Sequence, residues 1–324
     1  MKYVLITDTH FGVKNGSGTW FRSQSAFIYE QLIPYLKELS QQEEVALVHM
    51  GDVFDTRSSV PTIIAYGVID MFEELCSVVS DFYVLQGNHD NASPNDPKYN
   101  TLELLLASVK AQNLHIVSKT LEKDNLVFIP WFDQESVNIT DLSAKYEGKV
   151  LFTHADIITG NPKLYTPVFS GHVHIPYING NVRNIGSCYP LDFHDTGSER
   201  YFYVWDPEDD SIQRIANKKS IRFWRIRNEE LVERDWMLCG QNDYIEIYIK
   251  FSLLQSEKYQ SICKEMQRNF KNCWVIPLPD ELQNNEVNIN YNIDNIIESS
   301  IPEDLRGYFE LIKQKTIERA EQRI

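Results

Sequence analysis

Short apolar runs separated by longer amphipathic stretches make up the first two hundred residues, and this alternation limits the possible folds more than any other feature. Each run is typical of a buried strand. The runs are Tyr3–Thr7, Val45–Met50, Phe82–Gln86, Leu126–Pro130, Val150–Thr153 and Val168–Ser170. Amphipathic stretches near Ser25–Ser40, Thr62–Val79 and Thr101–Gln112 predict helices, the first kinked by Pro34. The pattern indicates an α/β fold with helical crossovers.

Polar motifs follow the carboxyl ends of these runs. They hold five of the eight histidines and are Asp8-Thr9-His10, Gly51-Asp52, Gly87-Asn88-His89-Asp90, Thr153-His154 and Gly171-His172-Val173-His174. Ligand sites of open α/β sheets collect at this edge. We therefore expect the motifs to form one site.

The spacing within the motifs favours metal binding. In extended chain, residues i and i+2 point to the same side, so Asp8 can converge with His10, as can the two histidines of 171–174. Adjacent residues point apart, so one of Asn88 and His89 can face a metal while the other faces the substrate. Carboxylate, imidazole and amide ligands suit Mn²⁺, Fe or a similar octahedral ion better than calcium or thiolate-bound zinc. Two Asp, one Asn and four His exceed the needs of one ion and predict two ions bridged by one carboxylate.

The ordered series of motifs resembles that of calcineurin-like metallophosphoesterases. The stretches ITDTHFG, GDVFDTR and VLQGNHD, with IPW at 129–131 and Ile185-Gly186-Ser187 later, look more closely like SbcD-type DNA exonuclease subunits. Among these, the chain is most similar to the recombination endonuclease subunits of T-even-type phages. The resemblance covers roughly residues 1–205. It implies a calcineurin-like β-sandwich flanked by helices (α/β/β/α), with a small α+β capping domain and a C-terminal helix.

The same resemblance implies a two-metal centre and a role for each motif residue. The first metal would be held by Asp8, His10 and His174, the second by Asn88, His154 and His172, and both by Asp52. His89 would not bind metal but would contact the scissile phosphate and help the 3′ oxygen leave, as general acid or by orientation. Asp90 could orient His89 from behind.

One position departs from the pattern of some family members. Those members carry a His three residues after the bridging Asp, where it is linked to exonuclease activity. Here that residue is Asp55, as in bacterial and phage-like members. Asp55 could pair with Arg57 instead, so we assign it no catalytic role.

The chain changes character after Asp206. The segment Gln213–Arg227 is basic and free of acidic residues. It predicts either a DNA-backbone surface that includes Arg222, Arg225 and Arg227, or a strand and connector whose charges are solvated or pair with acidic residues of this protein.

The remaining residues predict a small β-α-β unit over 244–277 and a C-terminal segment of another kind. Asp280–Asp304 holds seven acidic residues and no Lys or Arg, which is typical of a linker. Ser300 and Glu303 form a capping box that opens a helix with an apolar stripe from Leu305 to Ile312. This stripe could pack on its own domain or, as the resemblance implies, dock on an SbcC-like coiled-coil ATPase subunit.

We therefore expect three parts: a metallophosphoesterase nuclease domain at 1–212, a DNA-contacting capping domain at 213–280, and a linker with the ATPase-binding helix at 281–324. The resemblance implies a homodimer within a heterotetramer, and a pair of amphipathic helices near the N-terminus could form the dimer interface. The sequence shows no signal peptide, no stretch of about 18 apolar residues and an odd set of five cysteines. These features indicate a cytoplasmic protein, in the bacterial host if phage-encoded.

The net charge of −15, from 31 Lys and Arg against 46 Asp and Glu, argues against a protein that holds nucleic acid by bulk charge alone. Two bound divalent ions would offset part of it at the site. We expect a Mn²⁺-dependent DNA exonuclease or endonuclease subunit that hydrolyses phosphodiester bonds in double-strand-break repair or recombination. Another calcineurin-like phosphodiesterase or phosphatase is the alternative enzyme. A non-catalytic interaction subunit is disfavoured by the intact ligand set. The remaining histidines, His49, His115 and His194, are expected in the core.

Overall fold

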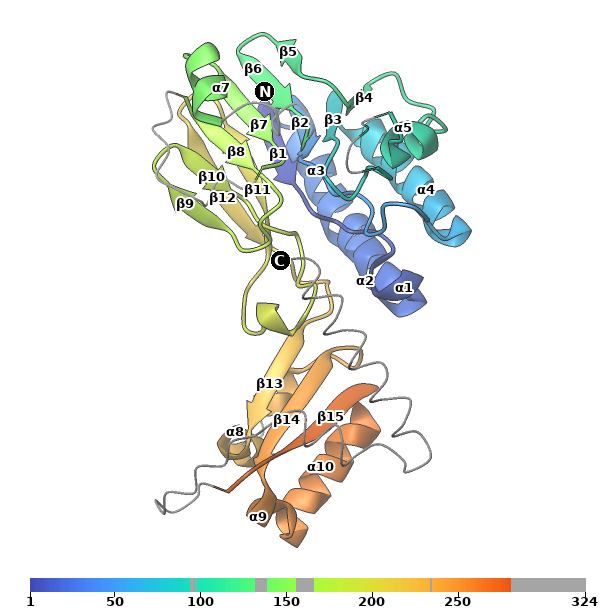
Figure 1. The fold of residues 1–324 in the computed structure, drawn as a ribbon, viewed down its shortest axis with the longest axis vertical. Helices are drawn as coiled ribbons and strands as arrows, with labels where there is room; N and C mark the ends of the chain where they lie inside the picture. Colours follow the sequence, from blue (N-terminus) through green and yellow to red (C-terminus); the bar gives the residue numbers. More distant parts are fainter. Residues whose placement is uncertain (94–95, 97, 132–138, 156–165, 234, 281–324) are drawn as a thin grey trace, which may run out of the picture. The chain divides into compact units, whose positions relative to one another are not determined.

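The computed structural model of the chain describes residues 1–93, 96, 98–131, 139–155, 166–233 and 235–280 (Figure 1). The chain divides into two compact units, Met1–Leu278 and Pro279–Ile324. The helices and strands described below belong to the first unit. The predicted linker and C-terminal helix at 281–324 lie outside the described residues. In the described part of the chain, we find no helix with the length and apolar character needed to span a membrane.

The first sheet has six strands in the order β12-β11-β1-β2-β3-β4. The strands are β1 Lys2–Ile6, β2 Val45–His49, β3 Asp81–Leu85, β4 Leu114–Val117, β11 Tyr201–Asp206 and β12 Ser211–Ala216. Strands β1 to β4 run parallel, and β11 is antiparallel to both β1 and β12. The carboxyl ends of β1, β2 and β3 therefore lie at one edge, as the sequence predicts.

The second sheet also has six strands, in the order β5-β6-β7-β8-β10-β9. They are β5 Leu121–Lys123, β6 Leu126–Ile129, β7 Val150–Thr153, β8 Val168–Ser170, β9 Tyr177–Asn179 and β10 Val182–Asn184. The inner four strands are parallel, and the edge strands β5 and β9 are antiparallel to their neighbours. The short edge strands were not predicted.

A row of aromatic rings joins the two sheets face to face. Tyr83 of the first sheet stacks on Phe128 of the second at 4.3 Å, and the row continues through Phe152 and Phe169 at 5.2 Å each. Phe169 then meets Trp205 of the first sheet at 5.1 Å. Helices cover the other face of the first sheet, and α7 (Ile139–Lys145) with Tyr146 covers the other face of the second (Figure 1). This arrangement confirms the predicted α/β/β/α sandwich.

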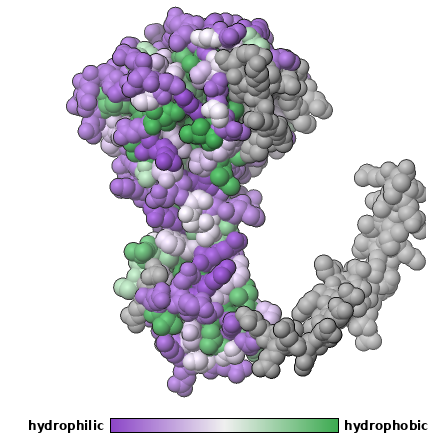
Figure 2. Space-filling model, turned by 90° about the vertical axis from the view of Figure 1, so that its left-hand side faces the viewer, coloured by the Kyte–Doolittle hydropathy of each residue, from purple (hydrophilic) through white to green (hydrophobic). Residues whose placement is uncertain are grey.

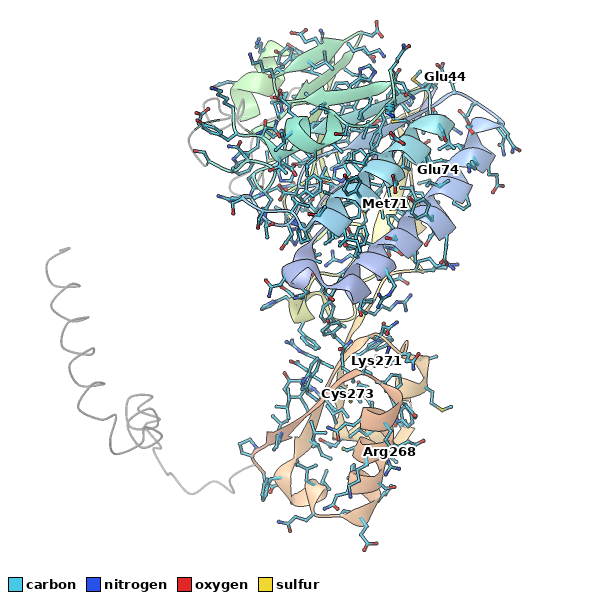
Figure 3. The ribbon with its side chains drawn as sticks, turned by 90° about the vertical axis from the view of Figure 1, so that its right-hand side faces the viewer. Glu44, Met71, Glu74, Arg268, Lys271 and Cys273 are labelled. Atoms are coloured by element: carbon cyan, nitrogen blue, oxygen red, sulfur yellow. The ribbon has the colours of Figure 1, made fainter. Side chains whose placement is uncertain are left out.

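The helices on the first sheet are α1 Val13–Gly16, α2 Gly18–Phe27, α3 Ile33–Ser40, α4 Thr62–Val78 and α5 Thr101–Leu106. A π-helical turn, Ile28–Leu32, separates α2 from α3 just before Pro34, which lacks an amide proton. On α4, Met71 is buried while Glu74 accepts from Lys37 of α3 at 2.8 Å (Figure 3). The helix predicted over 101–112 is wrong beyond Leu106. Asn113 donates to the carbonyls of Cys76 and Val79, which fixes the turn into β4.

A third, parallel sheet is formed by β13 Phe223–Arg227, β14 Tyr244–Lys250 and β15 Asn272–Leu278. It is accompanied by α8 Asn228–Glu233, α9 Phe251–Leu254 and α10 Glu257–Asn269. Every second residue of β14, at 245, 247 and 249, is fully buried, and α10 packs over β15 (Figure 3). The predicted β-α-β unit is present, with β13 as an additional strand.

The predicted boundary at 212/213 falls within β12, and the third sheet begins ten residues later. Trp20 of α2 donates to the hydroxyl of Tyr244 at 3.0 Å, so side chains of the two regions are in contact. The division into nuclease and capping domains stays a prediction. Over the described residues, the face drawn in Figure 2 is mostly hydrophilic, with small apolar areas between polar side chains.

Candidate metal centre

The predicted site residues lie on five loops, each at the carboxyl end of a strand. Three loops follow β1, β2 and β3 of the first sheet, and two follow β7 and β8 of the second. The two sheets therefore each contribute ligands, and the residues come together where the two edges meet.

The first group consists of Asp8, His10 and His174. Nε2 of His10 lies 3.3 Å from Nε2 of His174, and Oδ1 of Asp8 lies 3.8 Å and 3.6 Å from these two nitrogens. Asp8 is fully buried, and His10 is 3% exposed. Three ligand atoms of this kind, within 4.8 Å of one another, have the spacing of a metal site.

The second group consists of Asp52, His154 and His172, joined by Asn88. Oδ1 of Asn88 lies 3.1 Å from Nε2 of His154 and 3.0 Å from Nδ1 of His172. Oδ1 of Asp52 lies 3.3 Å from Nε2 of His154. One amide oxygen, one carboxylate and two imidazoles thus converge, which is a donor set suited to divalent transition ions.

Asp52 faces both groups. While its Oδ1 approaches His154, its Oδ2 lies 3.6 Å from Nε2 of His10 in the first group. Burial raises the pKa of Asp52, but His154 and His10 outweigh it and hold the pKa well below its usual range. Burial lowers the pKa of His154, and Asp52 raises it to about 9. The geometry is that of a carboxylate placed between two cation sites.

The polar atoms left over at the centre fit metal ions. Oδ1 of Asp8 is buried and accepts no hydrogen bond from a described residue, although two imidazole nitrogens lie within 4 Å of it. An unpartnered buried carboxylate oxygen is costly, and a cation would satisfy it. Gly87 keeps the adjacent space open, because a Cβ there would lie 2.2 Å from Oδ1 of Asp52. Divalent metal ions therefore suit these residues.

Four of the ligands have left-handed backbone conformations. The φ angles are 51° at Asp8, 42° at His10, 55° at Asp52 and 76° at His172. The expectation that these residues lie in extended chain is wrong, so extended geometry does not explain their convergence. Non-glycine residues adopt such angles rarely and at a cost, which is typical of functional sites.

His89 lies beside the two groups, with a ring nitrogen within 4.8 Å of ligand atoms of His10 and Asp52, and it has defined partners. Its amide donates to Oδ1 of Asp52 at 2.8 Å, and its Nδ1 donates to the carbonyl of Asp55 at 2.6 Å. Its ring meets that of His10 edge-on at 4.8 Å. A carbonyl only accepts, so Nδ1 keeps its proton and Nε2 is the ring nitrogen left for a substrate.

Asp90 has other partners than the expected ring of His89. Its Oδ1 accepts from the amide of Phe54 at 3.0 Å and its Oδ2 from the amide of Gly87 at 2.9 Å. The carboxylate is fully buried, and burial raises its pKa to about 7. Asp90 therefore ties the loop of Asp52 to the loop of Asn88 rather than orienting an imidazole.

Two further residues contact the ligands and were not assigned from the sequence. Oδ1 of Asp55 lies 3.4 Å from Nδ1 of His10, and we find no ion pair between Asp55 and Arg57 in the described structure. The ring of Trp131 lies 4.7 Å from that of His172. The IPW stretch contributed to the family resemblance, but the contact between Trp131 and His172 joins residues about forty positions apart and could not be predicted from the local sequence.

The arginines proposed for DNA contact lie on or next to β13 and are exposed. Arg225 pairs with Glu246 at 3.1 Å. Arg222 and Arg227 form no side-chain ion pair with a described residue. This placement leaves both readings of the basic segment open.

The three histidines outside the site differ from one another. His49 is fully buried, with Nε2 at 2.9 Å from the hydroxyl of Thr9, which confirms the core reading. His115 is half-buried and lies 2.7 Å from Asp81. For His194 the core reading is wrong, because its side chain is 91% exposed on a turn beside Asp192.

Residues 1–180 match the sequence profile of calcineurin-like phosphoesterases. The chain is 26% identical to exonuclease subunit 1 of Enterobacteria phage T4 over 242 residues, covering 67% of this chain and 68% of that protein. Two solved structures are also similar. A novel archaeal phosphodiesterase has a TM-score of 0.35 and 17% identity, covering 67% of this chain and 99% of its own. Phosphopantetheinyl hydrolase of Mycobacterium tuberculosis has a TM-score of 0.32 and 11% identity, covering 66% and 95%.

Proposed function

Because the chain belongs to the calcineurin-like phosphoesterase family, and is therefore a metallophosphoesterase hydrolase, we propose that it is a DNA nuclease that uses two divalent ions, Mn²⁺ by preference. The position of Asp52 carries this proposal. One of its carboxylate oxygens lies 3.3 Å from His154 and the other 3.6 Å from His10, so a single side chain can serve two adjoining cations.

In the proposed centre, Asp8, His10 and His174 hold one ion, and Asn88, His154 and His172 hold the other. Two such ions, when bound, polarise the phosphoryl oxygens and lower the pKa of a water. The ligand loops supply a rigid frame, since the backbone amide of His172 donates to Asp8 and that of His89 donates to Asp52.

His89 is the proposed catalytic side chain that does not bind metal. The Asp55 carbonyl holds its Nδ1–H, which fixes the ring and directs Nε2 away from that carbonyl. From there Nε2 can hold a proton near the leaving 3′ oxygen and transfer it as the phosphodiester breaks. The backbone bond to Asp52 keeps this ring beside the ligands.

DNA is the proposed substrate for two reasons. The 26%-identical phage T4 protein is named an exonuclease subunit, and exposed arginines without described ion pairs lie at the start of the third sheet.

With a formal charge of −15, the chain should hold DNA weakly by itself. We therefore also propose a cytoplasmic homodimer joined to a coiled-coil ATPase through 300–324, acting in double-strand-break repair or recombination. Deletion of 300–324 is expected to abolish co-purification with the ATPase subunit. Unchanged co-purification would contradict binding through this segment.

The nuclease proposal is tested by incubating the purified chain with linear duplex DNA and, separately, with a bis-aryl phosphodiester. Each reaction is run with Mn²⁺, with Mg²⁺ and with EDTA, and an Asp52→Asn variant serves as the control. We expect DNA cleavage that requires Mn²⁺ and is lost in the variant. Cleavage of the small ester with no action on DNA would instead favour a different phosphodiesterase.

A further inference from the structure

The segment Asn184–Arg200 provides none of the proposed metal ligands, yet its side chains contact the loops that carry all three ligands of the first group. We infer that this segment positions the first metal site, with Arg200 as its central positioning residue. The inference rests on the proposed use of two metal ions. It concerns Asp8, His10 and His174, and not the second group.

Asn184, the last residue of β10, holds the loop of His174 from one side. Its Nδ2 donates to the carbonyl of Val173 at 2.7 Å and to that of Ile175 at 2.9 Å. These carbonyls flank His174 in the chain. A side chain that binds both neighbours restricts the rotation of the peptide units between them.

Arg200 holds the carbonyl of His174 itself. Its Nη1 donates to that carbonyl, which also accepts from the amide of Ser187 at 3.1 Å. Gly186 makes this approach possible: its φ is +67°, and a Cβ there would lie 2.6 Å from the same oxygen. Three consecutive carbonyls of the loop, at 173, 174 and 175, are therefore bound by residues of Asn184–Arg200.

Asp195 fixes the guanidinium in turn. Nη2 of Arg200 donates to Oδ1 of Asp195, whose Oδ2 accepts from the amide of Leu191 at 2.7 Å. Arg200 is 2% exposed and Asp195 is 6% exposed. Breaking a buried pair by removing one charge is strongly destabilising, so the pair is held in one arrangement.

The same segment reaches the loop that carries Asp8 and His10. The hydroxyl of Tyr189 donates to the carbonyl of Thr9, which also accepts from Gln24 at 2.8 Å. Sγ of Cys188 donates to the carbonyl of Thr7 at 3.3 Å. Thr7 and Thr9 alternate with the two ligands, and those ligands have left-handed backbones that need such support.

The second group has different supports, which makes the inference selective. Asp90 ties Gly87 to Phe54, and the carbonyl of Met50 lies 2.7 Å from Nδ1 of His154. None of these contacts involves Asn184–Arg200. Within the second group, His172 shares the loop of His174, but Arg200 binds that loop two residues further on, at the carbonyl of His174. Loss of Arg200 should therefore weaken one metal site and spare the other.

The test is calorimetric titration of Mn²⁺ into EDTA-treated, dialysed protein, with metal content checked by mass spectrometry. The variant Arg200→Lys keeps a buried cation for Asp195 but lacks the second guanidinium nitrogen that donates to the carbonyl of His174. Wild type is expected to bind two Mn²⁺. The variant should bind one with unchanged affinity and the other about 10- to 100-fold more weakly, the usual cost of removing an outer-shell partner.

A matched control is Arg183→Lys. Arg183 pairs with Asp210 through two guanidinium nitrogens in the same region, and among the described residues it forms no hydrogen bond to a ligand loop. Tyr189→Phe removes only a hydroxyl and provides a second variant if Arg200→Lys unfolds; it should weaken the same site several-fold. If folded Arg200→Lys bound both Mn²⁺ ions with wild-type affinity, the inference would be overturned. If Arg200→Lys does not fold, wild-type affinity for both ions in Tyr189→Phe would overturn it. A wild type without Mn²⁺ affinity would overturn the proposed function as well.

Discussion

The Nδ1 atom of His89 donates to the backbone carbonyl of Asp55 at 2.6 Å, so the imidazole is oriented by main chain rather than by a carboxylate. His89→Ala should keep both metal ions, because none of the ligand atoms of the two groups is removed. Turnover should fall by about 100- to 10,000-fold, the usual contribution of general acid–base catalysis. Metal content and single-turnover cleavage are measured on the same preparation. Loss of metal in this variant would contradict the assignment.

Asp52 should act on both metal ions together. Its two oxygens lie 3.3 Å from His154 and 3.6 Å from His10, so Asp52→Ala removes a ligand from each site. We expect Mn²⁺ content near zero and no cleavage. Asn88→Ala is the comparison. Oδ1 of Asn88 lies beside His154 and His172 of the second group, so this variant should empty one site. Full metal content in Asp52→Ala would disprove the bridging role.

Asp55 should tune the first site through His10. Its carboxylate lies 3.4 Å from Nδ1 of His10, which places the other ring nitrogen among the ligands. Burial lowers the pKa of His10, but Asp55 and Asp8 raise it to about 10. Asp55→Asn should weaken one Mn²⁺ about 10- to 100-fold, as outer-shell partners do, and leave the main-chain bond to His89 in place. A loss of cleavage at saturating Mn²⁺ would instead implicate the carboxylate in the reaction.

The convergence of the ligands could be predicted from sequence because the carboxyl ends of neighbouring parallel strands lie at the same edge of a sheet. Asp8, Asp52 and Asn88 follow three strands that turn out to be parallel neighbours, so their loops meet at one edge. The backbone angles of Asp8 and His10 could not be predicted, because the surrounding fold imposes them against local preference.

The partners of the ligands were beyond prediction for a different reason. Asp90 is next to His89 in sequence, yet it binds the amide of Phe54, and Arg200 binds a carbonyl 26 residues away. Hydrogen bonds of this kind depend on which main-chain groups the packing leaves unpaired, and a pattern of residue types carries no record of that. Short edge strands such as β9 fail similarly, since three residues give too little periodicity.

DNA binding should depend on the exposed arginines that lack described ion pairs. The double change Arg222→Ala and Arg227→Ala, made in the inactive His89→Ala background, should weaken binding and reduce the slope of log K against log salt by about 0.9 for each phosphate that is no longer neutralised. Fluorescence anisotropy with labelled duplex measures both. Arg225→Ala is the control, because Glu246 already neutralises that guanidinium at 3.1 Å. An unchanged slope would mean that Arg222 and Arg227 do not contact DNA phosphates and are solvated instead.

His49 should make the fold sensitive to acid. The amide of Gly51 donates to its Nδ1 at 3.3 Å, and its Nε2 lies 2.9 Å from the hydroxyl of Thr9, which donates to the carbonyl of Val53. This network needs the neutral ring, and burial lowers the pKa of His49 to about 3. The unfolded chain takes up the proton below about pH 6.5 and the folded chain does not, so this contribution to stability is present above that pH and is lost as the pH falls toward 3.

Urea unfolding of metal-free protein at pH 6.5 and 5.0 measures this effect. Asn in place of His49 keeps an acceptor for Gly51 but cannot titrate. The free energy of unfolding of His49→Asn should therefore fall by roughly 1 to 2 kcal/mol less than that of wild type between the two pH values. His194→Asn, at an exposed position, should behave as wild type. Equal losses of unfolding free energy in wild type and His49→Asn would mean that His49 is protonated in the folded wild type as well as in the unfolded chain. The buried network would then tolerate a charged ring.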